Sequence, residues 1–167
     1  MHDGYFYFLT DSYCSKNKQY EVMGNKEIDE NGKPHSRPCY FAFEDIENPK
    51  ILWMIPVSSK VEKYEKIFQE KIYKYNIKDY DGIEFGFVRG HKNAFLIQNI
   101  SPALPGDIAD QYIDRKTRRP VTISDNTKRK IIQKAQKLIN ISKKDKQCTM
   151  TNVIEMLKNI NEQLKES

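Results

Sequence analysis

The sequence predicts an α+β fold in which a mainly antiparallel, twisted β-sheet is flanked by helices. Short runs of β-branched and aromatic residues come in pairs joined by turn residues, as in hairpins. Apolar residues at helical spacing occupy separate stretches, which is typical of an α+β arrangement. At 167 residues the chain has the length of one domain, about 100–200 residues. We therefore expect one domain over residues 1–167.

The β-rich runs define the expected strands. Between the first and second of them, residues 11–38 are polar, contain Asn31-Gly32 and two prolines, and predict a long loop with turns. We expect strands, in chain order, at Tyr5–Leu9, Cys39–Glu44, Ile51–Val57, Ile83–Val88, Ala94–Gln98 and Val121–Ile123, with a turn over Arg89–Asn93.

Four stretches carry helical signals. Ser59-Lys60-Val61-Glu62 has the form of a capping box, and the apolar spacing after it predicts a helix over 60–75. Pro105-Gly106-Asp107 predicts a short helix ending near Tyr112. Two amphipathic helices are expected over 125–141 and 151–165, with lysines of the first turned outward. The inward residues should be Ile131, Ala135, Leu138, Ile139, Val153, Leu157, Ile160 and Leu164.

Positive charge is concentrated in one segment. The net charge is +5, but residues 115–146 hold twelve Lys/Arg and two acids, so this segment carries +10 and the rest −5. Such segregation is typical of a protein that binds a polyanion. A solvated helix face would explain the same charges. An anionic membrane surface fits less well, because no amphipathic segment rich in Trp, Phe and Leu accompanies them.

Several functional classes are disfavoured. His2, His35 and His91 are scattered and no ligand spacing occurs, so no metal site is expected. No glycine-rich phosphate loop is present, and we expect no cofactor. Three cysteines without CxxC spacing favour the reducing cytoplasm. No apolar run approaches the roughly 20 residues of a membrane span, and the N-terminus has no secretory pattern.

Two distant polar segments are expected to meet. Antiparallel pairing of 39–44 with 51–57 brings residue 38 opposite residues near 57. The segment before the first strand holds His35 and Arg37, and the segment after the second holds Ser58, Ser59 and Lys60. We therefore expect these five side chains to lie close together.

Such a cluster suits metal-independent cleavage of RNA. A helix N-terminus attracts an anion, and Arg37 and Lys60 can neutralise charge on a pentacoordinate phosphorus. His35 can transfer a proton at neutral pH. The RNA supplies its own 2′-OH nucleophile, so the products would be a 2′,3′-cyclic phosphate and a 5′-OH. Each residue also has a structural explanation: Ser59 as a helix cap, and His35 and Lys60 as solvated surface groups.

Six ordered stretches match a known family. The chain resembles the toxins of type III toxin–antitoxin systems, the ToxN/AbiQ superfamily, and most closely its TenpN/CptN branch. The stretches that carry the resemblance are Gly24-Asn25-Lys26-Glu27, His35-Ser36-Arg37-Pro38, Ala42-Phe43-Glu44-Asp45, residues 53–64, residues 94–99 and Pro120-Val121-Thr122-Ile123 with the lysine-rich segment after it.

The resemblance implies a sequence-preferring, metal-independent endoribonuclease with a fold similar to MazF/Kid toxins, acting on cellular or phage RNA. It also implies inhibition by a small RNA pseudoknot, which the toxin cuts from a repeated antitoxin transcript. Toxin and RNA in this family form closed assemblies in which each RNA bridges toxin subunits.

The family's Thr/Ser-Ser before a lysine falls on Ser58, Ser59 and Lys60, and its basic residue before the following strand falls on Arg37. The ToxN branch has a proline between serine and lysine that is absent here, so the site lysine is either Lys60 or Lys63. His35 and Asn25-Lys26 belong to the TenpN/CptN pattern. The full set of expected RNA contacts is Asn25, Lys26, Lys33, Lys63, Arg115, Lys116, Arg118, Arg119, Lys128, Arg129, Lys130 and Lys134.

The leading hypothesis is thus an RNA-cleaving toxin, with His35, Arg37, Ser58, Ser59 and Lys60 as its catalytic residues. The rival hypothesis is a non-catalytic RNA-binding module that uses the basic face at 115–146. A protein-interaction domain without RNA leaves the segregation of charge unexplained.

Overall fold

A computed structural model describes residues 1–29, 31–144 and 148–167. Six strands form the main path of an antiparallel sheet in the order β6-β7-β5-β4-β1-β9, β8 pairs with β5, and β2 and β3 form a separate hairpin. The mainly antiparallel α+β fold is confirmed. The strands are β1 (Phe6–Leu9), β2 (Lys26–Ile28), β3 (Pro34–Ser36), β4 (Cys39–Glu44), β5 (Leu52–Ser58), β6 (Glu84–Val88), β7 (His91–Phe95), β8 (Ser101–Ala103) and β9 (Ile108–Gln111).

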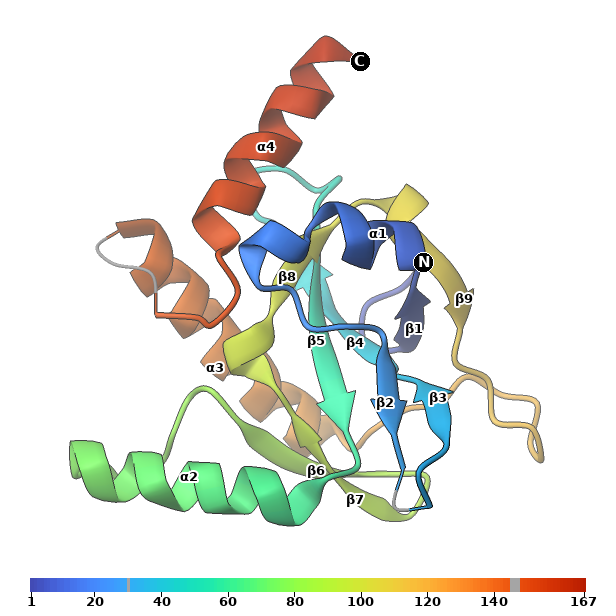
Figure 1. The fold of residues 1–167 in the computed structure, drawn as a ribbon, viewed down its shortest axis with the longest axis vertical. Coiled ribbons are helices and arrows are strands. Elements are labelled where there is room, and N and C mark those ends of the chain that lie inside the picture. The colour runs from blue at the N-terminus through green and yellow to red at the C-terminus, as the bar shows by residue number, and fades with distance from the viewer. Residues whose placement is uncertain (30, 145–147) are drawn as a thin grey trace.

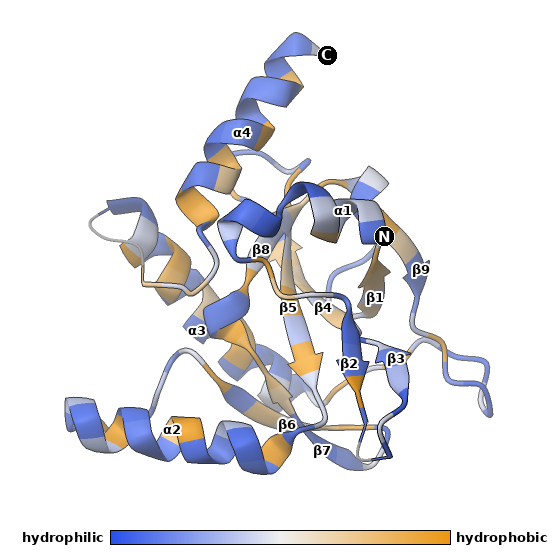
Figure 2. Cartoon of the chain, viewed as in Figure 1, coloured by the Kyte–Doolittle hydropathy of each residue, from blue (hydrophilic) through white to orange (hydrophobic). Residues whose placement is uncertain are grey.

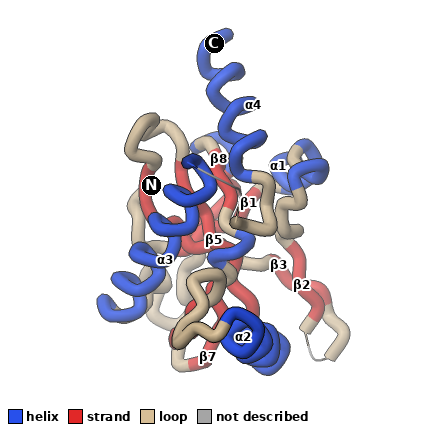
Figure 3. The backbone as a smooth tube through the Cα atoms, turned by 90° about the vertical axis from the view of Figure 1, so that its left-hand side faces the viewer, coloured by secondary structure: helices blue, strands red, loops and turns tan. Residues whose placement is uncertain are grey.

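Helices cover both faces of the sheet (Figure 1). Figure 3 shows α3 on one side, and α1 with the β2–β3 hairpin on the other. The C-terminal helix α4 extends away from the sheet, and α2 lies along the end formed by β6 and β7 (Figure 1). The helices are α1 (Asp11–Lys16), α2 (Val61–Tyr75), α3 (Asp125–Lys144) and α4 (Val153–Glu166).

Strand β5 divides the core, because alternate side chains point to opposite faces of a sheet. Trp53, Ile55 and Val57 pack in the cluster that contains the inward face of α3. Leu52 and Met54 pack in the cluster on the α1 side. The central strands are accordingly hydrophobic, whereas the β2–β3 hairpin is largely hydrophilic (Figure 2).

The expected inward residues of the last two helices can now be placed. Leu157 and Leu164 are only partly buried. The other six, Ile131, Ala135, Leu138, Ile139, Val153 and Ile160, are buried as expected.

The β4–β5 register matches the expected pairing. Cys39 lies opposite Pro56, and the Val57 N–H donates to the Pro38 carbonyl at 3.1 Å. The segment that enters β4 therefore runs beside the segment that leaves β5, which is the arrangement the candidate site requires.

The prediction of a loop over residues 11–38 is wrong. Thr10 caps α1 by accepting the Tyr13 N–H at 3.1 Å, and a 3₁₀ turn follows at Lys18–Tyr20. The Asn31-Gly32 turn then separates β2 from β3. Strands of three residues have too few side chains to show a period-2 pattern, so polar composition concealed them.

The second hairpin is tighter than expected. Arg89 and Gly90 have φ angles of 52° and 79°, and Val88 pairs with His91. Two residues with positive φ close a type I′ turn whose twist matches the flanking strands. The next strand therefore occupies His91–Phe95 and not Ala94–Gln98.

Two further expectations fail near the sheet edge. Pro105–Asp107 forms only a 3₁₀ turn, because Ile108–Gln111 is extended and pairs with β1. Residues 121–123 are not a strand, although Pro120 makes an isolated bridge to Ile113. In both places a short segment takes its conformation from its neighbours.

The Ser59 side chain does not cap α2. The N-cap residue is Lys60, which makes no side-chain capping bond. The Val61 N–H donates to the backbone carbonyl of Ser59 at 2.9 Å. The Ser59 hydroxyl is thereby left out of the helix cap.

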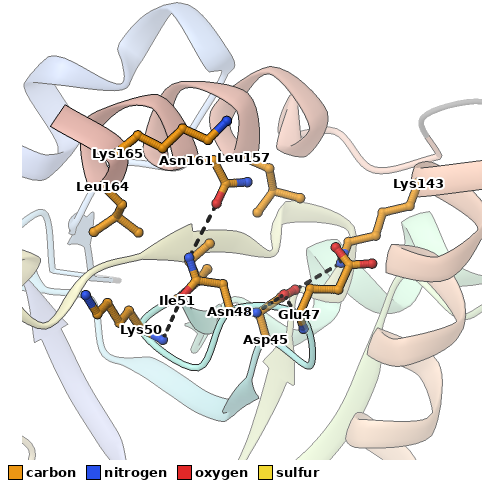
Figure 4. A pocket seen from close by; sticks show the side chains of 10 residues that line it. All are labelled: Asp45, Glu47, Asn48, Lys50, Ile51, Lys143, Leu157, Asn161, Leu164 and Lys165. Carbon is orange, nitrogen blue, oxygen red and sulfur yellow. Dashed lines mark hydrogen bonds and ion pairs between the residues drawn. The ribbon is translucent and has the colours of Figure 1, made fainter.

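A hollow of about 530 Å³ lies between the β4–β5 turn and α4 (Figure 4). Asp45 accepts hydrogen bonds there from Trp53 Nε1 at 3.0 Å and Lys143 Nζ at 3.1 Å. Burial acts to raise the pKa of Asp45, but the bonds from Trp53 and Lys143 outweigh it and lower that pKa. The Asp45 carboxylate thus has a structural role in this hollow, where it joins the β4–β5 turn to Lys143 of α3.

A membrane-spanning helix is not found among the described residues, since none of their helices has the necessary length and hydropathy.

Replacing Gly86 with alanine should destabilise the fold. A Cβ at this position would lie 2.5 Å from Thr127 Cγ2, at the start of α3. Crowding of this kind costs about 1–3 kcal/mol. We expect Gly86→Ala to lower the free energy of unfolding in urea by that amount, and the added substitution Thr127→Ser to restore most of it.

Gly106→Ala is the control, because a Cβ there meets nothing within 4 Å. Gly106→Ala should raise the free energy of unfolding, by no more than about 1 kcal/mol. Equal destabilisation by the two alanines would contradict the close approach of β6 to α3.

Candidate active site and RNA-binding groove

A groove of about 1160 Å³ opens beside the β2–β3 hairpin, where β1, β5 and β6 end and β7 begins. Its lining mixes apolar and polar side chains from segments far apart in the sequence. Among the residues that line it are Phe8, Asn25, Lys26, Glu27, His35, Ser59, Arg89, His91, Asn93, Tyr112 and Arg115.

The buried carboxylate of Glu27 lies at the centre of the candidate catalytic cluster. The Ser58 hydroxyl donates a short hydrogen bond to Glu27 Oε1. Arg37 Nη2 lies 3.8 Å from the same oxygen, and His35 Nε2 lies 3.5 Å from Oε2. The expected proximity of His35 and Arg37 to Ser58 is therefore confirmed, whereas their catalytic roles stay predictions.

The two serines have different environments. Ser58 is 1% exposed, and besides donating to Glu27 its hydroxyl accepts the Lys60 N–H at 3.1 Å. Ser59 is exposed and lines the groove. Of the two expected phosphate contacts, only Ser59 is thus accessible. Ser58 is buried and holds Glu27 through its hydrogen bond.

The basic groups of the cluster also differ in access. The His35 side chain is 40% exposed, but that of Arg37 is only 10% exposed. Arg37 Nε is buried and makes no hydrogen bond to the described part of the chain. Lys60 is exposed at the start of α2, and Lys63 is exposed with its Nζ 5.3 Å from the centre of the Tyr64 ring.

Asn25 and Lys26 form part of the groove wall near α1. Asn25 Nδ2 donates to the Leu9 carbonyl at 3.0 Å and to Asp11 Oδ1 at 2.7 Å, and Lys26 Nζ lies 3.8 Å from the same Asp11 oxygen. The Asn25 amide therefore fixes the wall, while Lys26 stays exposed. Lys33 is exposed in the turn between β2 and β3.

A basic turn over residues 114–119 follows β9 and projects from the body of the molecule (Figure 1). Asp114 holds it by accepting the N–H groups of Lys116 and Thr117 at 2.8 and 2.9 Å. Arg89 Nε donates to the same carboxylate at 2.7 Å. The turn presents the exposed side chains of Arg115, Lys116, Arg118 and Arg119.

The basic residues of α3 do not form one uniform face. Lys134 is buried, and its ammonium bonds Asp79 and Glu84 at 3.0 and 2.9 Å and the carbonyls of Tyr80 and Ile83. The expectation that Lys134 points outward to RNA is therefore wrong. Its ammonium is fully used in joining α3 to the start of β6.

The other basic residues of α3 differ in whether an acid pairs with them. Lys137 pairs with Asp81, and Lys143 with Asp45. Arg129 and Lys130 are exposed and Lys128 is half-buried, so these three remain candidates for RNA contact. Lys146 lies outside the described residues.

Sequence reasoning missed Glu27, His91 and Asn93 as groove residues. The sequence predicts a loop around Glu27, whose burial depends on β2 packing beside the end of β5, where Ser58 bonds it. It predicts a turn over His91 and Asn93, but alternate positions of β7 bring both to the groove. Correct assignment of the two-residue turn would have revealed their shared face.

Within residues 1–29, 31–144 and 148–167, no group of three or more His, Cys, Asp or Glu side chains could hold a metal ion. The side chains that line the groove offer hydrogen bonding, proton transfer through imidazole, and neutralisation of an anion by lysine and arginine.

No family model and no curated protein matches this sequence. Solved structures do match. AbiQ, a lactococcal anti-phage endoribonuclease belonging to the type III toxin–antitoxin system, aligns over 98% of both chains with a TM-score of 0.66 and 13% identity. The likeness shows that this chain has the same fold.

A second similar structure comes from work on bacterial type III toxin–antitoxin systems and selective toxin inhibition by a non-coding RNA pseudoknot. It aligns over 99% of this chain and 100% of its own, with a TM-score of 0.64 and 17% identity. The two alignments agree that the shared fold extends over nearly the whole chain.

The order of the 114–119 turn should depend on ionised Asp114. Hydrogen bonds from the Thr117 N–H and from Arg89 lower the pKa of Asp114 to about 2, against an ordinary value of about 3.9. Because the pKa of Asp114 is lowered in the folded turn, the ionised carboxylate stabilises the turn at any pH above the ordinary pKa. This stabilisation is lost as the pH falls through about 2. An NMR titration of the Asp114 carboxyl should therefore have its midpoint near pH 2.

Arg89→Ala should raise the midpoint toward the ordinary value, since it removes one of the three hydrogen bonds that lower the pKa of Asp114. Arg129→Ala is the control, because Arg129 bonds Asn126 on α3 instead. An ordinary Asp114 pKa in the unmodified protein would contradict the assigned role of this carboxylate.

Proposed function

We propose that this protein is a metal-independent, sequence-preferring endoribonuclease toxin of a type III toxin–antitoxin system. The observation that carries the proposal is the convergence of His35, Ser59 and the buried Glu27–Arg37 pair at one groove. The fold shared with AbiQ, itself an endoribonuclease, supports it. The ordered motifs favour the ToxN/AbiQ superfamily and its TenpN/CptN branch.

Cleavage would use the 2′-OH of the RNA as nucleophile. The 2′-oxygen bonds to phosphorus as the bond to the 5′-oxygen breaks, which leaves a 2′,3′-cyclic phosphate and a 5′-OH. Ser59 and the α2 N-terminus bind the scissile phosphate, and Lys60 or Lys63 neutralises its growing charge. His35 transfers a proton.

Arg37 would act mainly through Glu27. Its side chain is nearly buried and faces the carboxylate, whose charge it balances. A buried carboxylate without such a partner would be costly and would oppose the approach of RNA. Arg37 thus allows an acidic group to lie beside a phosphate-binding site.

RNA would extend from the groove onto the basic surface. Arg115 already lines the groove, and Lys116, Arg118 and Arg119 continue the turn outward. Further contacts would come from Asn25, Lys26, Lys33, Lys128, Arg129 and Lys130. Lys134 is left out, because it is buried in its own ion pairs.

The partners we propose are cellular or phage RNA as substrate and a small repeat-derived RNA pseudoknot as antitoxin. Support comes from the similar structure in which a non-coding RNA pseudoknot selectively inhibits a type III toxin. We further propose a closed, RNA-bridged oligomer in the cytoplasm, where Cys14, Cys39 and Cys148 would stay as the free thiols seen here.

His35→Ala and Ser59→Ala should stay folded and lose cleavage. Both side chains are accessible, so their removal costs little stability. Loss of an acid–base group or of a phosphate donor should slow cleavage by about 10²–10⁴-fold. The measurement is single-turnover cleavage of total RNA in EDTA, with the ends mapped and tested for cyclic phosphate.

His2→Ala and Ser12→Ala are matched controls on exposed residues and should cut at the unmodified rate. If His35→Ala and Ser59→Ala also cut at that rate, the site assignment is wrong. RNA binding without any cleavage by the unmodified protein would favour the rival RNA-binding module.

RNA affinity should fall with salt. Each phosphate contact contributes about −0.7 to the slope of log affinity against log salt for a single strand. Arg118→Gln and Arg119→Gln should each make the slope shallower by about 0.7, while Lys158→Gln, which removes an exposed α4 lysine paired with Glu155, should not. An affinity independent of salt would exclude the basic surface as the RNA contact.

A further inference from the structure

Glu27 divides its two carboxylate oxygens between different partners. Oε1 accepts from the Ser58 hydroxyl and faces Arg37, whereas Oε2 faces His35 Nε2 at 3.5 Å. The residue is only 4% exposed. A buried ionised carboxylate is tolerated when it is paired and hydrogen-bonded, and these three groups supply that compensation.

The backbone fixes the approach of Glu27 to His35. The two residues lie directly opposite each other in the β2–β3 hairpin. Such cross-strand neighbours have Cβ atoms about 4.5–5.5 Å apart. The imidazole therefore lies beside the carboxylate because of strand register, while 40% of the His35 side chain remains open to solvent.

The direction of the ring matters for proton transfer. A carboxylate can only accept hydrogen bonds, so a carboxylate facing Nε2 favours the tautomer with its proton on Nε2. Nδ1 then carries the lone pair. A base whose proton-bearing nitrogen is held by a third group is the general arrangement for orienting an acid–base catalyst.

We propose that Glu27 is a positioning residue, which holds the His35 imidazole in the Nε2–H tautomer so that Nδ1 takes the proton of the 2′-OH. This inference rests on the proposed function and adds to it the group that orients its base. The 2′-oxygen bonds to phosphorus as its proton passes to Nδ1. The bond from phosphorus to the 5′-oxygen breaks, and that oxygen takes a proton from water.

A purely structural role for Glu27 makes a different prediction. Ser58 also connects Glu27 to the end of β5, so Glu27 could serve only to dock the β2–β3 hairpin. In that case Glu27→Gln would change stability and leave the ring tautomer as it was. In the positioning role, the amide NH₂ of the glutamine faces Nε2 as a donor and favours the opposite tautomer.

The test is ¹⁵N NMR of the histidine rings in the whole protein, with His35 assigned by comparison with His35→Ala. Under conditions where the ring is neutral, we expect the Nε2–H tautomer in the unmodified protein and a shift toward Nδ1–H in Glu27→Gln. Glu155→Gln, which removes an exposed carboxylate on α4, should leave the His35 tautomer as it is in the unmodified protein.

Kinetics supply the second readout. Because Glu27 is buried, Glu27→Gln should lower kcat by about 10²–10⁴-fold and leave KM nearly unchanged. An Nδ1–H tautomer in the unmodified protein would overturn the proposal, even if Glu27→Gln proved too unstable to purify. The proposal would also be overturned if a folded Glu27→Gln protein kept both the His35 tautomer and the kcat of the unmodified protein.

The two proposals fail separately. If the unmodified protein cuts no RNA, the proposed function is wrong, whereas the tautomer still tests whether Glu27 orients His35. If the protein cuts RNA and the tautomer is Nδ1–H, the proposed function stands and only the role of Glu27 is overturned.

Discussion

The hydrogen bond between the Val57 N–H and the Pro38 carbonyl determines where the candidate site forms. It closes the β4–β5 ladder at the point where one strand enters the sheet and the other leaves it. Residues on either side of this bond are about twenty positions apart in the sequence but adjacent in space. The groove, the start of α2 and the docking of the β2–β3 hairpin all follow from that register.

The buried charge of Glu27 adds a second constraint. The Ser58 hydroxyl, the Arg37 guanidinium and the His35 imidazole surround one carboxylate. Taking such a charge out of water is costly unless its partners keep good geometry, so the cluster has few alternative arrangements. The need to satisfy one buried group thus holds residues from three segments in a fixed relation, which is what a catalytic site requires.

The distribution of charge along the sequence differs from the distribution of accessible charge on the surface. Residues 115–146 looked like one basic face, but Lys134 is buried in ion pairs and Lys137 and Lys143 are paired with acids. Accessible basic side chains lie on the 114–119 turn, which Asp114 organises, and on α3 at Arg129 and Lys130. Helical spacing shows which side of a helix is apolar, but it does not show which lysine meets an acid from another part of the chain.

The long elements and the meeting of the two polar segments could be predicted from the sequence, because α2 and α3 have helical apolar spacing and β4 and β5 are runs of β-branched and aromatic residues. The short elements β2, β3 and β9, and with them the position of Glu27, depend on tertiary packing. Segments of three or four residues have too few side chains to specify their own conformation. Their conformation comes from the partners to which they dock, and so does the chemistry of the residues they carry.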